Sequence, residues 1–132
     1  MTVTLKTRRA VLERDNHQCI AAAFRYHVPC SGPLTMQHTV GRGMGGSKLF
    51  DTPDLLITMC QGHNVLLTAS AEFQVIGKSR GWVRDRNAKR DHRLTPVLYA
   101  DGWHRMIGDR RDPIPEGDAL EYMALIGVRV VS

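Results

Sequence analysis

The sequence from Leu34 to Cys60 reads LTMQHTVGRGMGGSKLFDTPDLLITMC, and QGHN follows it directly. Two short apolar runs, Leu34–His38 and Leu55–Met59, predict β-strands. Residues 39–54 between them contain four glycines and a proline, which predict a loop because these residues interrupt regular structure. The order of strand, loop, strand and a Cys-x-x-His-Asn turn therefore predicts a compact unit of two strands followed by a helix.

Helical patterns lie before the first strand and after Asn64. The segment TRRAVLERD, Thr7–Asp15, predicts a short helix with Ala10 and Val11 facing inward, which Asn16 can end. After Asn64, apolar residues recur at helical spacing until Gly77 or Gly81, and they predict one helix. The residues expected to face the core are Val65, Leu66, Ala69, Phe73 and Ile76.

The C-terminal part has a β-hairpin signal. Asp101-Gly102 lies between two β-rich runs in TPVLYADGWHRMIG, and such a dipeptide is typical of a two-residue hairpin turn. The tail DALEYMALIGVRVV predicts one or two helical turns and a last strand. We therefore expect one α+β domain over residues 1–132, with a core at 8–82 and a C-terminal extension at 94–132.

The positive charge is concentrated in one segment. Between Lys78 and Arg93 there are seven Lys and Arg against two Asp, a surplus of five that equals the net charge of the whole chain, +5. Such a segment favours a phosphate-bearing partner, because neutralising backbone phosphates releases condensed counterions. The alternative is a solvated surface loop.

The sequence has no feature expected of a membrane or secreted protein. It contains no run of 18 apolar residues, and the N-terminal TVTLKTRR lacks the apolar stretch of a signal peptide. We therefore expect no membrane partner and a cytoplasmic location. In such a compartment, the three cysteines are better explained as metal ligands than as disulfide partners.

Cys60 and His63 have the spacing of a metal knuckle. Cys19 and Cys30 upstream complete a set of four ligands, which predicts a closed tetrahedral zinc site. A structural zinc would also stabilise a short strand pair that has little core of its own. The alternatives are that the cysteines are buried as small apolar residues, or that His63 binds a catalytic metal and no zinc is present.

Several segments together resemble the HNH endonucleases with a ββα-metal fold, in particular small phage and actinobacterial members. The segments are RRAVLERDNHQC, LTMQH, GRGMGGSK, DLLITMC and HN, within residues 8–82. The resemblance implies hydrolysis of DNA phosphodiester bonds. Low sequence specificity is expected because contacts of the basic segment and Arg42 with the DNA backbone should dominate binding. The resemblance also implies a location in the host cytoplasm if the protein is phage-encoded, and phage DNA-processing or packaging proteins as partners.

The resemblance assigns catalytic roles to individual positions. His38 matches the general base that deprotonates a water, and Asn64 matches a ligand of the catalytic Mg²⁺ or Mn²⁺. Cys19, Cys30, Cys60 and His63 match the zinc positions. Two positions depart from the family pattern: Gln37 stands where a charged metal ligand is usual, and Leu55 stands where an asparagine is usual.

A shift of one residue in the comparison would give Asp54 the role of the missing asparagine and make it a ligand of the cation. If Gln37 and Leu55 abolish cleavage, the alternative function is a zinc-stabilised DNA-binding module on the same fold. A third function, a protein-interaction factor, is disfavoured by the basic segment. The residues expected to contact DNA phosphates are Arg42, Lys48, Lys78, Arg80, Arg84, Arg86, Lys89 and Arg90.

Overall fold

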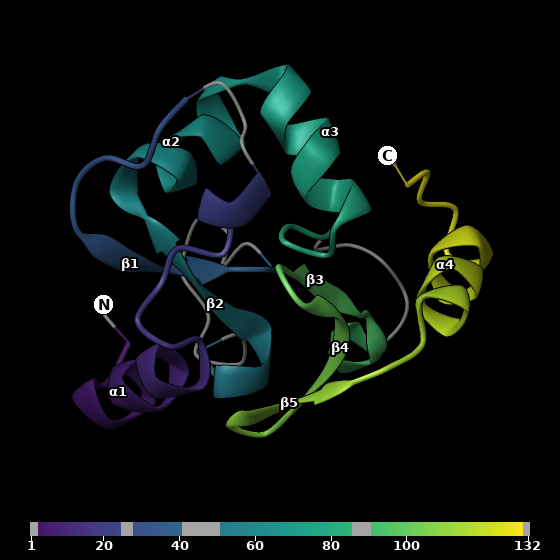
Figure 1. Ribbon diagram of the computed structural model, residues 1–132, viewed down its shortest axis with the longest axis horizontal. Coiled ribbons are helices and arrows are strands. Elements are labelled where there is room, and N and C mark those ends of the chain that lie inside the picture. Colours follow the sequence, from purple (N-terminus) through teal and green to yellow (C-terminus); the bar gives the residue numbers. More distant parts are fainter. Residues whose placement is uncertain (1–2, 25–27, 41–50, 86–90, 131–132) are drawn as a thin grey trace.

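The computed structural model describes residues 3–24, 28–40, 51–85 and 91–130. Within these residues the chain is mixed α+β, with four α-helices, two small antiparallel sheets and short 3₁₀ turns (Figure 1). The elements are α1 Leu5–Arg14, η1 Ala22–Phe24, β1 Leu34–His38, η3 Pro53–Leu55, β2 Leu56–Cys60, α2 Gln61–Ala69, α3 Ala71–Ser79, η4 His92–Leu94, β3 Val97–Tyr99, β4 Gly102–Ile107, β5 Arg110–Pro113 and α4 Glu116–Leu125.

The first sheet is a pair of strands, β1 and β2, with Leu34 opposite Cys60 and His38 opposite Leu56. All five residues of β2 are buried, because the strand lies between α1 on one side and α2 on the other (Figure 1). The strand β1 has the predicted bounds. The second strand begins one residue later than predicted, because Leu55 belongs to η3.

The predicted long helix is two helices, which corrects the expectation for residues 64–81. Ser70 interrupts it with extended backbone angles, and its side chain accepts a hydrogen bond from Phe73 N at the start of α3. The break changes which face of α2 is inside. Leu67 is 2% exposed, whereas Val65, which we expected in the core, is 56% exposed.

The C-terminal sheet has the order β3-β4-β5. The hairpin signal is confirmed: Tyr99 pairs with Gly102, and the φ of 119° at Gly102 lies in the region that favours glycine. The strand β5 was not predicted. The tail forms the ten-residue helix α4 instead of one or two turns, and residues 128–130 form no strand.

One apolar cluster draws on both sheets. It joins Ile57 and Met59 of β2 to Phe73 and Trp82 and to Val97 of β3. A second, smaller cluster packs α4 against the C-terminal sheet through Trp103. No helix in the described part of the chain has both the length and the apolar character needed to cross a bilayer.

Candidate metal centre

Four side chains converge where β2 ends and α2 begins. One atom each of Cys19, Cys30, Cys60 and His63 lies within 4.8 Å of the others. His63 Nδ1 is 3.1 Å from Cys60 Sγ and 3.6 Å from the sulfurs of Cys19 and Cys30. A tetrahedral zinc ion would separate its nitrogen and sulfur ligands by about 3.5 Å. The cluster could therefore hold a structural metal ion such as zinc.

The helix start explains why a Cys-x-x-His spacing brings two ligands together. Cys60 is the N-cap of α2, and its sulfur accepts a hydrogen bond from His63 N at 3.4 Å. Both ligands thus lie in the first turn. Cys19 reaches them because Ile20 N donates to Thr58 O of β2 at 2.9 Å, which fixes the loop after α1 beside the strand.

Cys30 comes from a turn that lies against the same helix start. Gln61 N donates to Pro33 O and Gly62 N donates to Ser31 O, both at 2.9 Å. A Cβ atom on Gly62 would collide with Ser31 Oγ, so a larger residue here would require the Ser31 side chain to turn away.

His63 is held in the orientation that a metal ligand needs. Its Nε2 lies 2.8 Å from Val28 O, and a carbonyl can only accept, so Nε2 carries the ring hydrogen. The lone pair of Nδ1 then faces the three sulfurs. The ring is 2% exposed and stacks on Phe73 with centroids 5.7 Å apart.

The three thiols differ in acidity because their surroundings differ. Burial alone would raise the pKa of Cys60, but hydrogen bonds from the backbone of His63 and Ser31 lower it to about 7. Burial and the nearby Cys19 raise the pKa of Cys30 to about 12. Burial also raises the pKa of Cys19. A bound divalent cation would favour all three thiolates.

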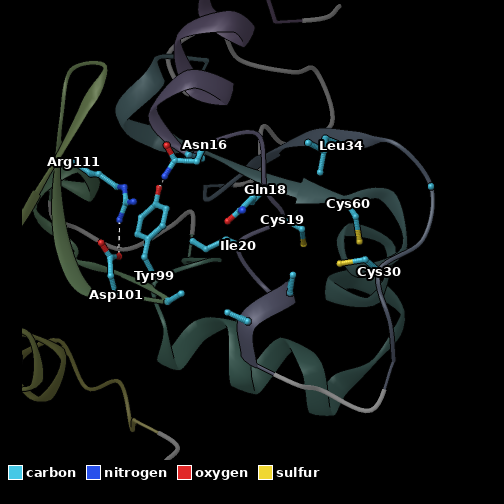
Figure 2. A pocket seen from close by; sticks show the side chains of 15 residues that line it. Asn16, Gln18, Cys19, Ile20, Cys30, Leu34, Cys60, Tyr99, Asp101 and Arg111 are labelled. Carbon is cyan, nitrogen blue, oxygen red and sulfur yellow. Dashed lines mark hydrogen bonds and ion pairs between the residues drawn. The ribbon is translucent and has the colours of Figure 1, made fainter.

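A cavity of about 690 Å³ borders the cluster. Cys19, Cys30 and Cys60 lie on one side of it, and Tyr99 and Arg111 lie on the other (Figure 2). Cys30 is the exposed member of the cluster, so this side of the metal centre faces solvent. Sequence reasoning found the four ligands, but nothing in the sequence indicated the cavity.

The candidate base His38 lies at the end of β1 and is partly exposed. Its Nε2 is 2.8 Å from Asp51 Oδ1, a partner that the sequence analysis did not identify. The neighbouring Gln37 points to the other face of the strand, as alternation requires. Gln37 is 8% exposed, and its amide donates to the backbone oxygens of His38 and Trp82 at 2.9 and 3.4 Å.

The other predicted ligands of a catalytic cation also have internal partners. Asn64 Nδ2 donates to Thr35 Oγ1 at 2.8 Å, and Asp54 accepts from Thr52 and Arg93 at 2.6 and 3.0 Å. In the described residues, the cysteine-histidine cluster is the one group of three or more His, Cys, Asp or Glu side chains placed to bind a metal ion.

The predicted DNA-contacting residues have different environments. Lys78 is exposed. Arg80 stacks over the rings of Phe24 and Trp82 at 4.4 and 5.0 Å. Arg84 was expected to present a free guanidinium to DNA. Its side chain is instead packed inside and donates to two backbone carbonyls. The remaining residues, Arg42, Lys48, Arg86, Lys89 and Arg90, lie outside the described residues.

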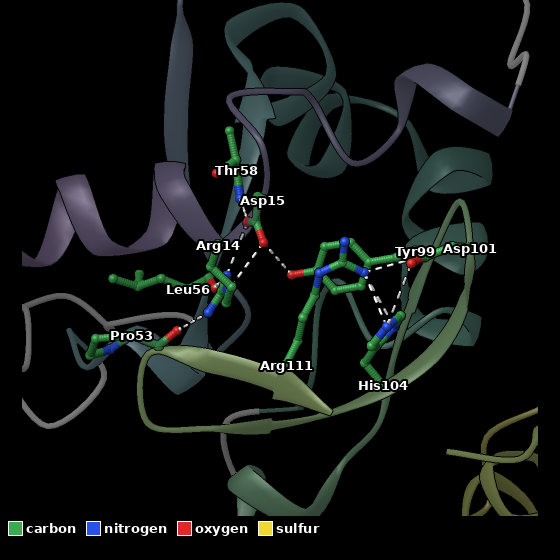
Figure 3. A network of polar contacts seen from close by, with 9 residues as sticks. All are labelled: Arg14, Asp15, Pro53, Leu56, Thr58, Tyr99, Asp101, His104 and Arg111. Atoms are coloured by element: carbon green, nitrogen blue, oxygen red, sulfur yellow. Dashed lines mark hydrogen bonds and ion pairs between the residues drawn. The ribbon is translucent and has the colours of Figure 1, made fainter. Parts of the chain in front are cut away.

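A buried carboxylate, also missed by sequence reasoning, connects the half that contains the cysteine-histidine cluster to the C-terminal sheet. Asp15 accepts hydrogen bonds from Arg14, from Thr58 N and from the hydroxyl of Tyr99 (Figure 3). Arg111 packs over the Tyr99 ring at 4.1 Å. An aspartate at a helix end is usually a solvated residue, so its position in the sequence carried no signal of this role.

Comparison with known proteins gives no family assignment for the chain. No protein-family model matches it, and neither a curated protein nor a solved structure matches it significantly.

Proposed function

We propose that the protein is a metal-dependent DNA endonuclease with a zinc-stabilised ββα-metal core of the HNH type. The observation that carries the proposal is the His38–Asp51 pair at the end of β1. It lies in a β1-β2-α2 unit whose strand-helix junction carries the cysteine-histidine cluster. Double-stranded DNA is the proposed partner, and a role in phage DNA processing or packaging belongs to the same proposal.

The contact between His38 and Asp51 supports a role of His38 as the general base. With the Asp51 carboxylate accepting from Nε2–H, the imidazole Nδ1 is left to accept a proton from water. The water oxygen forms the new bond to phosphorus and its proton passes to His38. The bond from phosphorus to the leaving oxygen breaks, and solvent protonates that oxygen.

Asn64 is proposed to hold the catalytic Mg²⁺ or Mn²⁺ through its amide oxygen, because its amide nitrogen donates to Thr35. Gln37, buried on the face of β1 opposite His38, would have to turn toward the ion in order to assist. Asp54 would have to give up its hydrogen bond from Arg93 in order to bind the ion as well. When bound, such an ion stabilises negative charge on the phosphate and the leaving oxygen. Because hard cations prefer charged oxygens, this set predicts weak affinity.

A second function, DNA binding without cleavage, is favoured by a specific observation. Leu55, at the position where the resembled family has an asparagine, is 1% exposed inside the core, so no polar group orients the base from there. In this case the ββα unit and its cationic surface bind DNA, and no metal-dependent product forms.

Plasmid cleavage distinguishes the two functions. The wild type is incubated with supercoiled plasmid in Mg²⁺, Mn²⁺ or chelator, beside His38→Ala and Asp51→Asn. The matched control is His17→Asn, because His17 is exposed and asparagine tolerates its φ of 52°. We expect metal-dependent nicked or linear product, with a loss of about 10²-fold or more in His38→Ala.

Two results would count against the endonuclease proposal. His38→Ala cleaving as fast as the His17→Asn control would refute His38 as the base. Plasmid binding without product by the wild type would select the DNA-binding module.

A further inference from the structure

The turn at residues 51–54 holds two functional groups from different parts of the chain. Asp51 pairs with His38 of β1, and three residues later Asp54 Oδ2 accepts from Arg93 Nε at 3.0 Å. Thr52 Oγ1 donates to the other oxygen of Asp54 at 2.6 Å and orients that carboxylate. The imidazole and the Arg93 guanidinium are therefore anchored to neighbouring positions of one short turn.

A second set of contacts, made by Arg84, links the backbone next to His38 to the backbone on either side of Arg93. Arg84 N donates to the backbone oxygen of Thr39, the residue after His38, at 2.6 Å. The Arg84 side chain then donates to His92 O at 2.6 Å and Thr95 O at 3.3 Å, on either side of Arg93. Burial lowers the pKa of Arg84 to about 10, so it remains a cation at neutral pH.

These contacts give Arg93 a combination of order and access that the other described cations of the basic segment lack. Its side chain is 48% exposed although Asp54 holds its Nε and Asp91 Oδ1 lies 3.8 Å from its Nη1. Arg80 is stacked on aromatic rings and Arg84 is used internally, whereas Lys78 is exposed. A guanidinium that is already ordered loses less conformational freedom when it binds a phosphate.

We propose that Arg93 binds a DNA backbone phosphate beside His38, and that Asp54 and Arg84 act as positioning residues for its guanidinium. The inference rests on the proposed function and deepens it. The proposed cation ligands Asn64 and Gln37 are neutral and bind a hard cation weakly, so a fixed cationic side chain of the protein is needed beside the phosphate. The planar guanidinium of Arg93 supplies that charge and two parallel donors for phosphate oxygens.

Salt-dependent DNA binding tests the phosphate contact without requiring cleavage. A labelled duplex is titrated with wild type, Arg93→Ala and Arg93→Lys in metal-free buffer at several salt concentrations, with anisotropy as the readout. The matched control is Arg110→Ala, since Arg110 is also an exposed arginine held by an aspartate, with Nε 3.0 Å from Asp112.

We expect Arg93→Ala to bind about 10-fold more weakly and to reduce the slope of log affinity against log salt by about one, as loss of one phosphate contact does. Arg93→Lys keeps the slope, because the charge remains. Arg110→Ala binds like the wild type. Equal affinity and slope for Arg93→Ala and Arg110→Ala would overturn the inference.

Plasmid cleavage by the same proteins separates this inference from the proposed function. If the wild type cleaves and Arg93→Ala binds normally, the endonuclease proposal stands and the Arg93 contact is wrong. If the wild type binds without cleaving and Arg93→Ala loses the contact, the phosphate site stands and the endonuclease proposal is wrong. A wild type that neither binds nor cleaves overturns both.

The positioning role of Asp54 has its own readout. Removing a carboxylate from a DNA-binding surface should strengthen binding if Asp54 acts only through its charge. If it positions Arg93, Asp54→Ala instead weakens binding of the labelled duplex in the same titration, while the salt slope stays that of the wild type because the Arg93 charge remains. Tighter binding by Asp54→Ala would contradict the positioning role.

Discussion

Replacing Tyr99 with phenylalanine removes one hydrogen bond that joins the two sheets. The Tyr99 hydroxyl donates to Asp15 Oδ1 at 2.7 Å, and the Asp15 side chain is fully inaccessible to solvent (Figure 3). Phenylalanine keeps the ring packing and leaves Asp15 with donors from Arg14 and Thr58 N. Because hydrogen bonds to charged groups contribute about 1.5–3 kcal/mol, we expect the free energy of unfolding to fall by about 2 kcal/mol.

Removing the carboxylate itself should cost more. In Asp15→Ala, the Arg14 guanidinium, only 2% exposed, keeps its bonds to Pro53 O and Leu56 O but loses its counter-charge. Breaking a buried ion pair from one side costs about 3–5 kcal/mol. That is a large share of the roughly 5–15 kcal/mol by which a typical domain is stable.

Urea unfolding followed by tryptophan fluorescence measures both effects, since Trp82 and Trp103 lie in separate buried clusters. Zinc is kept at one concentration throughout. The control is Tyr122→Phe, whose ring packs in the second cluster and whose loss of a hydroxyl should change stability by less than about 0.5 kcal/mol. A Tyr99→Phe protein as stable as this control would refute the role of the network.

Two further predictions concern pH. The apparent zinc affinity of the metal-free protein, measured by competition with a chromophoric chelator, should rise with pH. The slope of log affinity against pH should decrease by about one as the pH rises through 7, because the Cys60 thiol has then already lost its proton before zinc binds. A slope that stays constant would count against Cys60 as a zinc ligand. Burial and Arg111 lower the pKa of His104 in the folded protein, so the unfolded chain takes up this proton first, and stability should fall as the pH drops below 6.5. In urea titrations His104→Gln should reduce this pH dependence, and a profile like that of the wild type would argue against it.

Local signals in the sequence were enough to predict several elements. The strand β1 has its predicted bounds because an apolar run is followed by glycines that cannot extend it. The hairpin follows from the need for a positive φ at Gly102. The four residues of the candidate metal site were predicted to come together because a Cys-x-x-His spacing places two of them in one helical turn, and the structure brings all four together.

Other features depended on contacts between distant segments. The strand β5 consists of polar and charged residues at a sheet edge, so it has no apolar alternation to detect. Ser70 ends α2 by capping α3, and an apolar periodicity that continues across the break hides this. The pairing of His38 with Asp51 joins residues 13 positions apart in the sequence, for which no spacing rule exists.

Metal analysis of the purified protein tests most directly the claim that a metal centre organises the β1-β2-α2 unit. We predict one zinc per chain by mass spectrometry in the wild type, and loss of zinc together with lower stability in His63→Ala and Cys60→Ser. His17→Asn serves as the control, because His17 is exposed and lies outside the cluster. A wild type without zinc, or a His63→Ala protein that retains a full equivalent, would contradict the account.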